Sequence, residues 1–256
     1  MDDYSVIGKN TPLVYADKRN ASIATINDCL PDIYYKRFDI REFIGEQLAT
    51  IRNVRSNHYF LLCFDRNFKS NLRNGSANTF SLKVGSFDFM SSDVIYKTAP
   101  MLPFYFEKDS FSILLDKCSS DENRLQFINE NLEMFALDIY MSQCDRGGNT
   151  FYEFHPNGEI HVAPVFDYEM SLNKVDGKDI FYTSDFFQFL TIDDYQEMMC
   201  VYPQFREMLE SYLDVSLRGQ ILSMARSRKF LISGIDLEYY ERYDEIAHKK
   251  LEKILK

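Results

Sequence analysis

Two stretches of sequence decide the fold of this chain. Residues 137–149 read LDIYMSQCDRGGN, and residues 162–172 read VAPVFDYEMSL. Between them lie two β-rich runs, 151–154 and 159–166, separated by a turn that contains Asn-Gly, the strongest short-range signal for a β-hairpin. A hairpin returns the chain to its starting point. The sequence therefore predicts that the two quoted stretches lie side by side.

The two stretches carry side chains suited to phosphoryl transfer. Asp145 and Asn149 end the first stretch, and Asp167 lies within the second. Phosphoryl transfer uses one carboxylate to orient the incoming hydroxyl group, and a further carboxylate and an amide oxygen to hold Mg²⁺ against the nucleotide phosphates. Carboxylates brought close together repel each other, which favours a bound cation between them. The pattern indicates a site for a nucleotide and a metal ion.

These residues resemble the catalytic loop and metal-binding segment of HipA-like serine/threonine kinases, which share their architecture with phosphatidylinositol 3- and 4-kinases. The Ala-Pro pair at 163–164 is the most family-specific element. The resemblance implies that Asp145 is the catalytic carboxylate, that Asn149 and Asp167 bind Mg²⁺, and that ATP is the phosphate donor.

A second match lies upstream, in the order that the family requires. A predicted strand carries Lys36, and the predicted helix that follows carries Glu42 and Glu46. The resemblance implies that Lys36 contacts the nucleotide phosphates and that Glu42 is its acidic partner, with Glu46 as the alternative. On a helical wheel both glutamates lie roughly opposite the apolar stripe.

The loop departs from the family pattern in two ways. The family places five residues from the catalytic Asp to the metal-binding Asn, whereas Asp145 to Asn149 spans four, and Gly147 replaces a residue that is often polar or basic. Gly147 and Gly148 permit backbone angles that deliver Asn149 in the shorter loop; the alternative is a site that has lost efficiency. Arg146 has three open roles, which are to neutralise carboxylates, to hold a phosphate or to form a surface ion pair.

The chain as a whole predicts an α+β protein with the two-lobed, protein-kinase-like fold. Strand-forming runs dominate residues 1–108, with one amphipathic helix from Ile40 to Ile51, and residues 109–256 are mainly helical. We expect a β-rich N-lobe and a mainly helical C-lobe to form one catalytic domain, with ATP and Mg²⁺ in the cleft. The predicted strands are 4–7, 21–26, 33–38, 58–64 and 80–84, with a polar loop at 66–79. The further predicted helices are one that Ser119 caps and that continues to Ile139, followed by 195–213, 217–225 and 237–255.

Composition narrows the class of protein. The chain has 256 residues, and 29 basic against 39 acidic residues give a net charge of −10, which argues against nucleic acid as a partner. The five cysteines include no C-x-x-C pair, and neither a signal peptide nor an apolar run long enough to cross a membrane is present, so we expect a cytoplasmic protein. With 22 Phe, 17 Tyr and no Trp, the core must consist of Phe and Tyr beside aliphatic residues, and buried Tyr hydroxyls need hydrogen-bond partners.

These observations predict a Mg²⁺-dependent kinase that transfers the γ-phosphate of ATP to a Ser or Thr hydroxyl of a protein. Two alternatives remain open: a catalytically impaired pseudokinase that binds a nucleotide or a protein, and a kinase acting on a small molecule or lipid. The family often works in toxin and antitoxin pairs, so the resemblance permits an antitoxin-like partner. Neither nucleic acid nor a membrane is expected as a partner.

Overall fold

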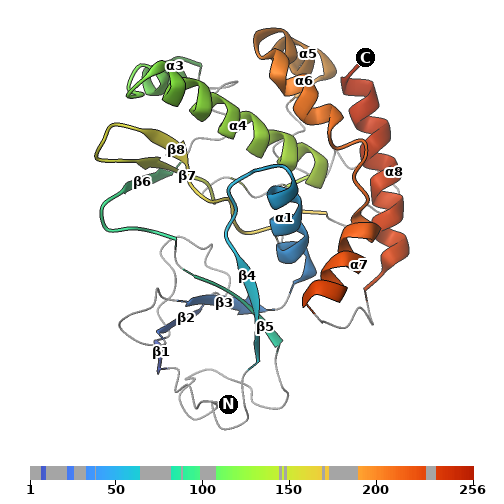
Figure 1. Ribbon diagram of the computed structural model, residues 1–256. Coiled ribbons are helices and arrows are strands. Elements are labelled where there is room, and N and C mark those ends of the chain that lie inside the picture. The colour runs from blue at the N-terminus through green and yellow to red at the C-terminus, as the bar shows by residue number, and fades with distance from the viewer. Residues whose placement is uncertain are drawn as a thin grey trace.

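The chain forms two antiparallel sheets and seven helices among the residues that the structure describes (Figure 1). The structure is a computed structural model. The described residues are 7–9, 22–25, 33–37, 39–63, 82–87, 89–98, 108–143, 146, 149–168, 171–172, 190–228 and 235–256.

Five strands form the larger sheet in the order β1-β2-β3-β5-β4, and every neighbouring pair is antiparallel. The strands are β1 (Ile7–Lys9), β2 (Ser22–Thr25), β3 (Ile33–Arg37), β4 (Tyr59–Cys63) and β5 (Leu82–Phe87). The predicted strands at 21–26, 33–38 and 58–64 are confirmed, and β5 overlaps the expected 80–84. The predicted loop at 66–79 and residues 4–6 of the first predicted strand lie outside the described residues.

Three strands form the smaller sheet in the order β6-β7-β8. They are β6 (Ile95–Thr98), β7 (Phe151–Phe154) and β8 (Ile160–Val162). The predicted hairpin is confirmed as β7 and β8, and Gly158 in its turn has a φ of +85°, which favours glycine. The sequence did not predict β6, because its four residues, IYKT, do not alternate between apolar and polar types. Since β6 pairs with β7, residues that precede position 108 share a sheet with residues that follow it.

Most helices begin and end near their predicted bounds. They are α1 (Ile40–Ile51), α3 (Lys108–Leu115), α4 (Asp121–Met141), α5 (Ile192–Val201), α6 (Pro203–Glu210), α7 (Leu217–Arg228) and α8 (Leu237–Ile254). The helix predicted at 195–213 is two helices, because Pro203 starts a new one and cannot continue the old. The sequence missed α3. No helix among the described residues is long and apolar enough to span a membrane.

The N-terminus of α4 differs from the prediction in two details. Ser120, not Ser119, caps the helix, because its side chain accepts a hydrogen bond from the backbone N–H of Asn123. Leu125, which the helical spacing places on the apolar stripe, is 57% exposed. Asn123 and Phe127 face inward instead. The stripe that spacing predicts is therefore confirmed only beyond the first turn of the helix.

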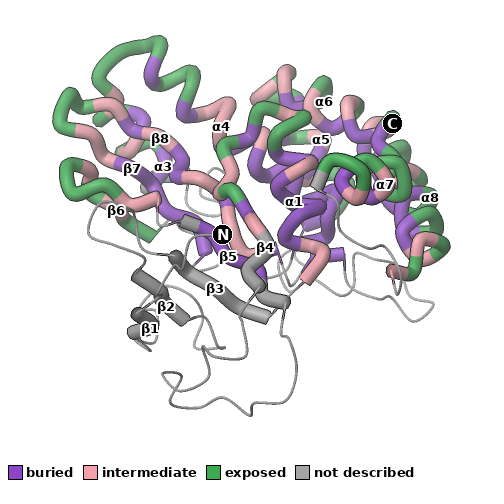
Figure 2. Tube along the Cα trace, turned by 60° about the horizontal axis from the view of Figure 1, so that its bottom comes forward, coloured by how far each residue is buried: buried purple, intermediate pink, exposed green. Residues whose placement is uncertain are grey.

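The long helix α4 is the centre of the core. It contacts β8, α6 and α1, and most of its second half is buried (Figures 1 and 2). Phe135 stacks on Phe205 with ring centroids 5.7 Å apart, and Tyr140 stacks on Tyr212 at 5.0 Å. The prediction of a core built from Phe and Tyr is confirmed.

The prediction that buried Tyr hydroxyls find partners is correct at most positions and wrong at two. The Tyr140 hydroxyl donates to Asp244 at 2.5 Å, and the Tyr243 hydroxyl donates to the backbone carbonyl of Tyr140 at 2.9 Å. Among the described residues, the hydroxyls of Tyr195 and Tyr212 are buried without a hydrogen-bond partner. Burial raises the pKa of both groups, because the charged form is disfavoured in a dry interior.

Glu133 on α4 contributes a pH-dependent term to stability. Burial, and to a smaller extent the neighbouring Glu130, raises the pKa of Glu133 from 4.5 to about 7. At a pH between 4.5 and about 7, Glu133 is protonated in the folded chain and ionised in the unfolded chain. The protonated carboxyl group therefore favours folding at low pH, and this contribution to stability is lost as the pH rises through about 7. Glu133→Gln, which mimics the protonated form, should therefore stabilise the chain more at pH 8 than at pH 5.

Thermal unfolding at the two pH values measures this effect. Glu207→Gln, at an exposed position on α6, is the matched control and should alter stability by similar amounts at both. An equal effect of Glu133→Gln at pH 5 and pH 8 would contradict the prediction.

Candidate active site

The segment that leads to Asp167 is fastened to the loop between α1 and β4. The backbone N–H of Val165 donates to the carbonyl of Arg55 at 2.8 Å, and the N–H of Asn57 donates to the carbonyl of Val165 at 2.9 Å. Ser56 and Val165 thereby form an isolated parallel bridge. This bridge fixes the position of the backbone two residues before Asp167.

The backbone of Asp167 is held on both sides. Its φ is +60°, in the left-handed region that Asp and Asn enter more readily than other non-glycine residues. Its N–H donates to the Tyr59 hydroxyl at 3.0 Å, and its carbonyl accepts from Nε2 of Gln143 at 2.6 Å. Burial, and then the nearby Glu42, raises the pKa of Tyr59, which keeps this hydroxyl neutral. Side chains from β4 and from the end of α4 therefore meet at Asp167.

The next residue, Tyr168, joins the same segment to α1. Its backbone N–H donates to the Glu42 carboxylate at 3.0 Å, and its hydroxyl lies 3.0 Å from Oγ of Ser56. Its fully buried ring covers Gly45: a Cβ atom added there would lie only 2.2 Å from Cγ of Tyr168. Gly45 therefore permits the close approach of α1 to the Asp167 segment.

Arg146 forms a buried ion pair within residues 137–149 and a hydrogen bond to residues 162–172. Its guanidinium makes two hydrogen bonds to the Asp138 carboxylate, at 2.6 and 2.9 Å, and both side chains are 4% exposed. It also donates to the carbonyl of Phe166 at 2.7 Å and lies 5.4 Å from the centre of the Tyr168 ring. Burial raises the pKa of Asp138, and the positive charge of Arg146 opposes that rise.

Of the three roles left open for Arg146, the structure rules out the surface ion pair, because its pair with Asp138 is buried. The pair is buried because Asp138 lies on the inward face of α4, a position that helical spacing alone does not mark as charged. A guanidinium engaged by Asp138 and Phe166 is also not directed at a nucleotide phosphate.

The remaining predicted site residues lie as follows. Asp145 is outside the described residues. Lys36 lies on β3 opposite Val84 of β5, and its side chain is likewise outside the described part of the chain. Asn149 is 2% exposed, and its backbone N–H donates to the carbonyl of Arg146 at 3.1 Å. The pairing of Lys36 with Glu42 and the metal-binding roles stay predictions.

The helical wheel places both glutamates of α1 opposite the apolar stripe, but neither is exposed to solvent. Glu42 is fully buried and Glu46 is 5% exposed. The reason is that α1 is covered on more than one side, by α4 and α7 and by the segment that contains Tyr168. Oε1 of Glu46 lies 3.0 Å from Nδ1 of His58. Glu42, in contrast, accepts a hydrogen bond from the backbone N–H of Tyr168, next to Asp167.

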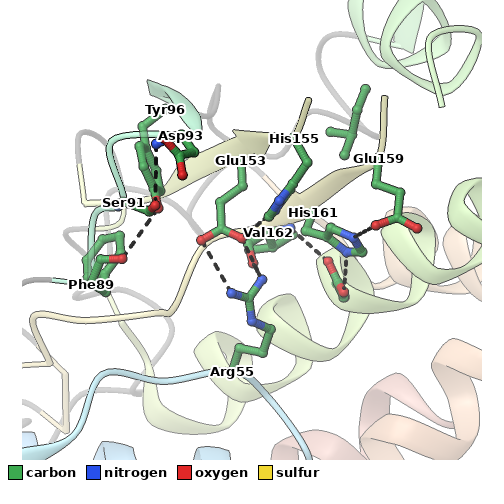
Figure 3. Close-up of polar contacts among 12 residues, drawn as sticks. Arg55, Phe89, Ser91, Asp93, Tyr96, Glu153, His155, Glu159, His161 and Val162 are labelled. Carbon is green, nitrogen blue, oxygen red and sulfur yellow. Dashed lines mark hydrogen bonds and ion pairs between the residues drawn. The ribbon is translucent and has the colours of Figure 1, made fainter. Parts of the chain in front are cut away.

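Arg55 and Glu153 fix the hairpin of β7 and β8 to the loop between α1 and β4. Neither residue was predicted from the sequence. In Figure 3 the Arg55 guanidinium reaches the Glu153 carboxylate, at 2.8 and 3.3 Å, and it also donates to the carbonyl of Val162 at 2.9 Å. His155 contacts Glu153, and its ring lies 5.3 Å from that of His161. Across the described ranges, no three His, Cys, Asp or Glu side chains are grouped to hold a metal ion.

The side chains of Asn149 and Asp167 fit the chemistry of Mg²⁺. An amide oxygen and a carboxylate are hard oxygen ligands of the kind that Mg²⁺ prefers. The segments that carry them are joined by the Gln143 and Arg146 hydrogen bonds.

Comparison with solved structures finds proteins of similar fold, whereas the sequence matches no model of a known protein family and has no significant match among curated proteins. One similar structure is HipA of Shewanella oneidensis, from a toxin–antitoxin complex with HipB and its operator DNA. It has a TM-score of 0.53 and 11% identity over 86% of this chain and 57% of HipA. Another is the proinflammatory kinase CtkA of Helicobacter pylori, with a TM-score of 0.51 and 14% identity over 91% of both chains.

The chain has the HipA-like kinase fold. The resemblance seen in the sequence is thus confirmed at the level of the fold, with mixed α and β structure and small antiparallel sheets. The similarity covers nearly all of CtkA, whereas this chain spans little more than half the length of HipA.

Proposed function

We propose that this chain is a Mg²⁺-dependent kinase that transfers the γ-phosphate of ATP to a Ser or Thr hydroxyl of a protein. One observation carries the proposal: in a HipA-like fold, buried hydrogen bonds hold the Asp167 segment against both α1 and the end of α4. Such rigid support is what a site for phosphoryl transfer needs, because its catalysis depends on positioning and charge stabilisation.

Each candidate residue has a defined task in this proposal. Asp145 orients the incoming hydroxyl group and takes its proton. The hydroxyl oxygen then bonds to the γ-phosphorus, the bond between the γ-phosphorus and the oxygen that bridges to the β-phosphate breaks, and ADP leaves. Asn149 and Asp167 are the Mg²⁺ ligands, and Lys36 contacts the α- and β-phosphates. When bound, Mg²⁺ neutralises the phosphate charge. Glu42 holds the backbone N–H of Tyr168 and so supports its neighbour Asp167.

We place the nucleotide between a β-rich N-lobe, residues 1–108, and a helical C-lobe, residues 109–256. The pairing of β6 with β7 supports the proposal that the two lobes are one catalytic unit, because it ties residues from both sides of the boundary. A cytoplasmic location is part of the proposal, since the cysteines include no C-x-x-C pair.

We also propose an antitoxin-like protein partner. The similar HipA structure contains HipB, which supports this class of partner for a chain with the same fold. Direct contact with the operator DNA is not part of the proposal, because a net charge of −10 repels a phosphate backbone.

A phosphate-transfer assay tests the proposed function. The purified chain is incubated with Mg²⁺ and ATP radiolabelled at the γ-phosphate, with and without a generic basic protein, beside Asp145→Ala and Asp167→Asn. We expect label on Ser or Thr with the wild type and only background label with either variant. Thermal unfolding with and without Mg-ATP measures nucleotide binding in parallel.

The outcomes separate the proposal from its alternatives. Stabilisation by Mg-ATP without label transfer would favour the pseudokinase, for which the four-residue spacing from Asp145 to Asn149 is the specific argument. Label on an added lipid or small molecule, and not on protein, would favour the other class of kinase. A folded chain that Mg-ATP does not stabilise would overturn the proposal.

A further inference from the structure

The two peptide groups that flank Asp167 are each held by one buried side chain. Tyr59 accepts the hydrogen bond of the Asp167 N–H, and Gln143 donates to the Asp167 carbonyl. We propose that Tyr59 and Gln143 are positioning residues that keep the Asp167 carboxylate aimed for metal binding. This inference rests on the proposed function, in which Asp167 is a Mg²⁺ ligand.

Asp167 needs such support because its backbone lies in an unfavourable region. A φ of +60° brings Cβ close to the neighbouring carbonyl oxygen, so a residue other than glycine stays there only when its surroundings hold it. Rotation of φ back to negative values would swing the Cα–Cβ bond and redirect the carboxylate. The hydrogen bonds on both sides oppose that rotation.

Gln143 is placed for this task by the end of α4. Ser142, the C-cap of α4, has a φ of +49°, and the N–H of Gln143 donates to the carbonyl of Asp138 at 3.0 Å. The Gln143 side chain is fully buried, and its Nε2 donates to Asp167 at 2.6 Å. A short bond from a buried donor at a fixed helix end restricts the position of the acceptor.

The oxygen of the Gln143 amide does not account for a glutamine at this position. Its Oε1 atom is buried and accepts no hydrogen bond within the described part of the chain. A buried acceptor without a partner costs stability, and a methionine of similar volume would avoid that cost. The amide is therefore accounted for by what its Nε2 group does, which is to hold Asp167.

Tyr59 contacts the other peptide group of Asp167 and lies on a different element, β4. It is 7% exposed, and its ring contacts those of Phe43 and Tyr168 edge-on, with centroids 6.3 and 6.4 Å apart. Because the ring is fixed by this packing, Tyr59→Phe should remove the hydroxyl and leave the ring where it is. The two residues therefore supply separate variants that act on the same aspartate.

Binding of Mn²⁺, a paramagnetic substitute for Mg²⁺, tests the proposal without relying on activity. Electron paramagnetic resonance measures the affinity for Mn²⁺ in the presence of a non-hydrolysable ATP analogue. We expect Gln143→Met and Tyr59→Phe each to weaken Mn²⁺ binding about 10-fold, as for residues that orient a metal ligand. The KM for Mg²⁺ in the transfer assay should rise with little change in kcat at saturating Mg²⁺.

Gln126→Met is the matched control, because it removes an exposed glutamine amide from α4, the helix that Gln143 follows. This control should bind Mn²⁺ as the wild type does. The double variant should weaken binding by a factor different from the product of the two single effects, because both residues hold one backbone segment. Thermal unfolding without metal shows whether each variant folds. If Gln143→Met does not fold, Tyr59→Phe alone tests the proposal.

Two outcomes would contradict the inference, and they can be distinguished. If the wild type binds Mn²⁺ with the nucleotide analogue and folded single variants bind it equally well, the positioning roles are overturned and the proposed function stands. If the folded wild type binds no Mn²⁺ with the analogue, the proposed function fails and this inference with it.

Discussion

Replacement of Arg146 by Met should lower the free energy of unfolding by about 3–5 kcal/mol, because it leaves the buried Asp138 carboxylate without its partner. The pair is 4% exposed on both sides, so water cannot replace the lost contacts. The carbonyl of Phe166 loses its donor as well. Urea unfolding followed by circular dichroism at pH 7 measures the loss.

Two further variants separate burial from charge. Arg218→Met removes an ion pair of similar length, 2.8 Å to Glu241, whose side chains are about half exposed, and should change stability by no more than about 1 kcal/mol. Adding Asp138→Leu to Arg146→Met removes the uncompensated charge and should recover most of the lost stability. Equal effects of Arg146→Met and Arg218→Met would show that the buried pair contributes no more than an exposed one.

Gly45→Ala should destabilise the chain by about 3 kcal/mol, although alanine favours helices over glycine by about 1 kcal/mol. The added Cβ would lie 2.2 to 2.5 Å from three ring atoms of Tyr168, so the ring or α1 must move. Either movement disturbs the bond from the Tyr168 N–H to Glu42. Thermal unfolding measures the stability.

Gly219→Ala on α7 is the matched control. A Cβ at that position meets only Ser216 atoms at 3.4 and 3.5 Å, an ordinary contact, so this change should stabilise the helix by up to about 1 kcal/mol. Opposite signs for the two glycine changes are therefore expected. In Tyr168→Ala, where the ring is absent, Gly45→Ala should lose most of its cost. A stabilised Gly45→Ala chain would contradict the close packing.

The sequence predicted the elements well where the pattern is local. Apolar residues at helical spacing gave α1 and α8, and an Asn-Gly turn between β-rich runs gave β7 and β8. The residues at 137–149 and 162–172, with their Ala-Pro pair, indicated the HipA-like fold, which the solved structures confirm. The strand β6 and the helix α3 were missed because they are short, with four and eight residues.

The contacts within the candidate site could not be predicted in the same way. The residue spacing of α4 does not identify Asp138 as the partner of Arg146. In the sequence, Asp138 is only a polar residue among the apolar residues of a buried helix. Gln143 and Tyr59 likewise stand in ordinary helix-end and strand contexts. Their roles depend on which backbone group of a distant segment each one meets.

The sequence by itself determined the residue types of the candidate site and the order in which they occur. It did so because secondary structure and motif order depend on neighbours along the chain. Only the tertiary structure decided that Glu42 holds Tyr168, that Arg146 is buried against Asp138, and that two side chains hold Asp167 at a φ of +60°. These contacts join residues far apart in sequence, and their strength comes from the exclusion of water, which only the packed fold provides.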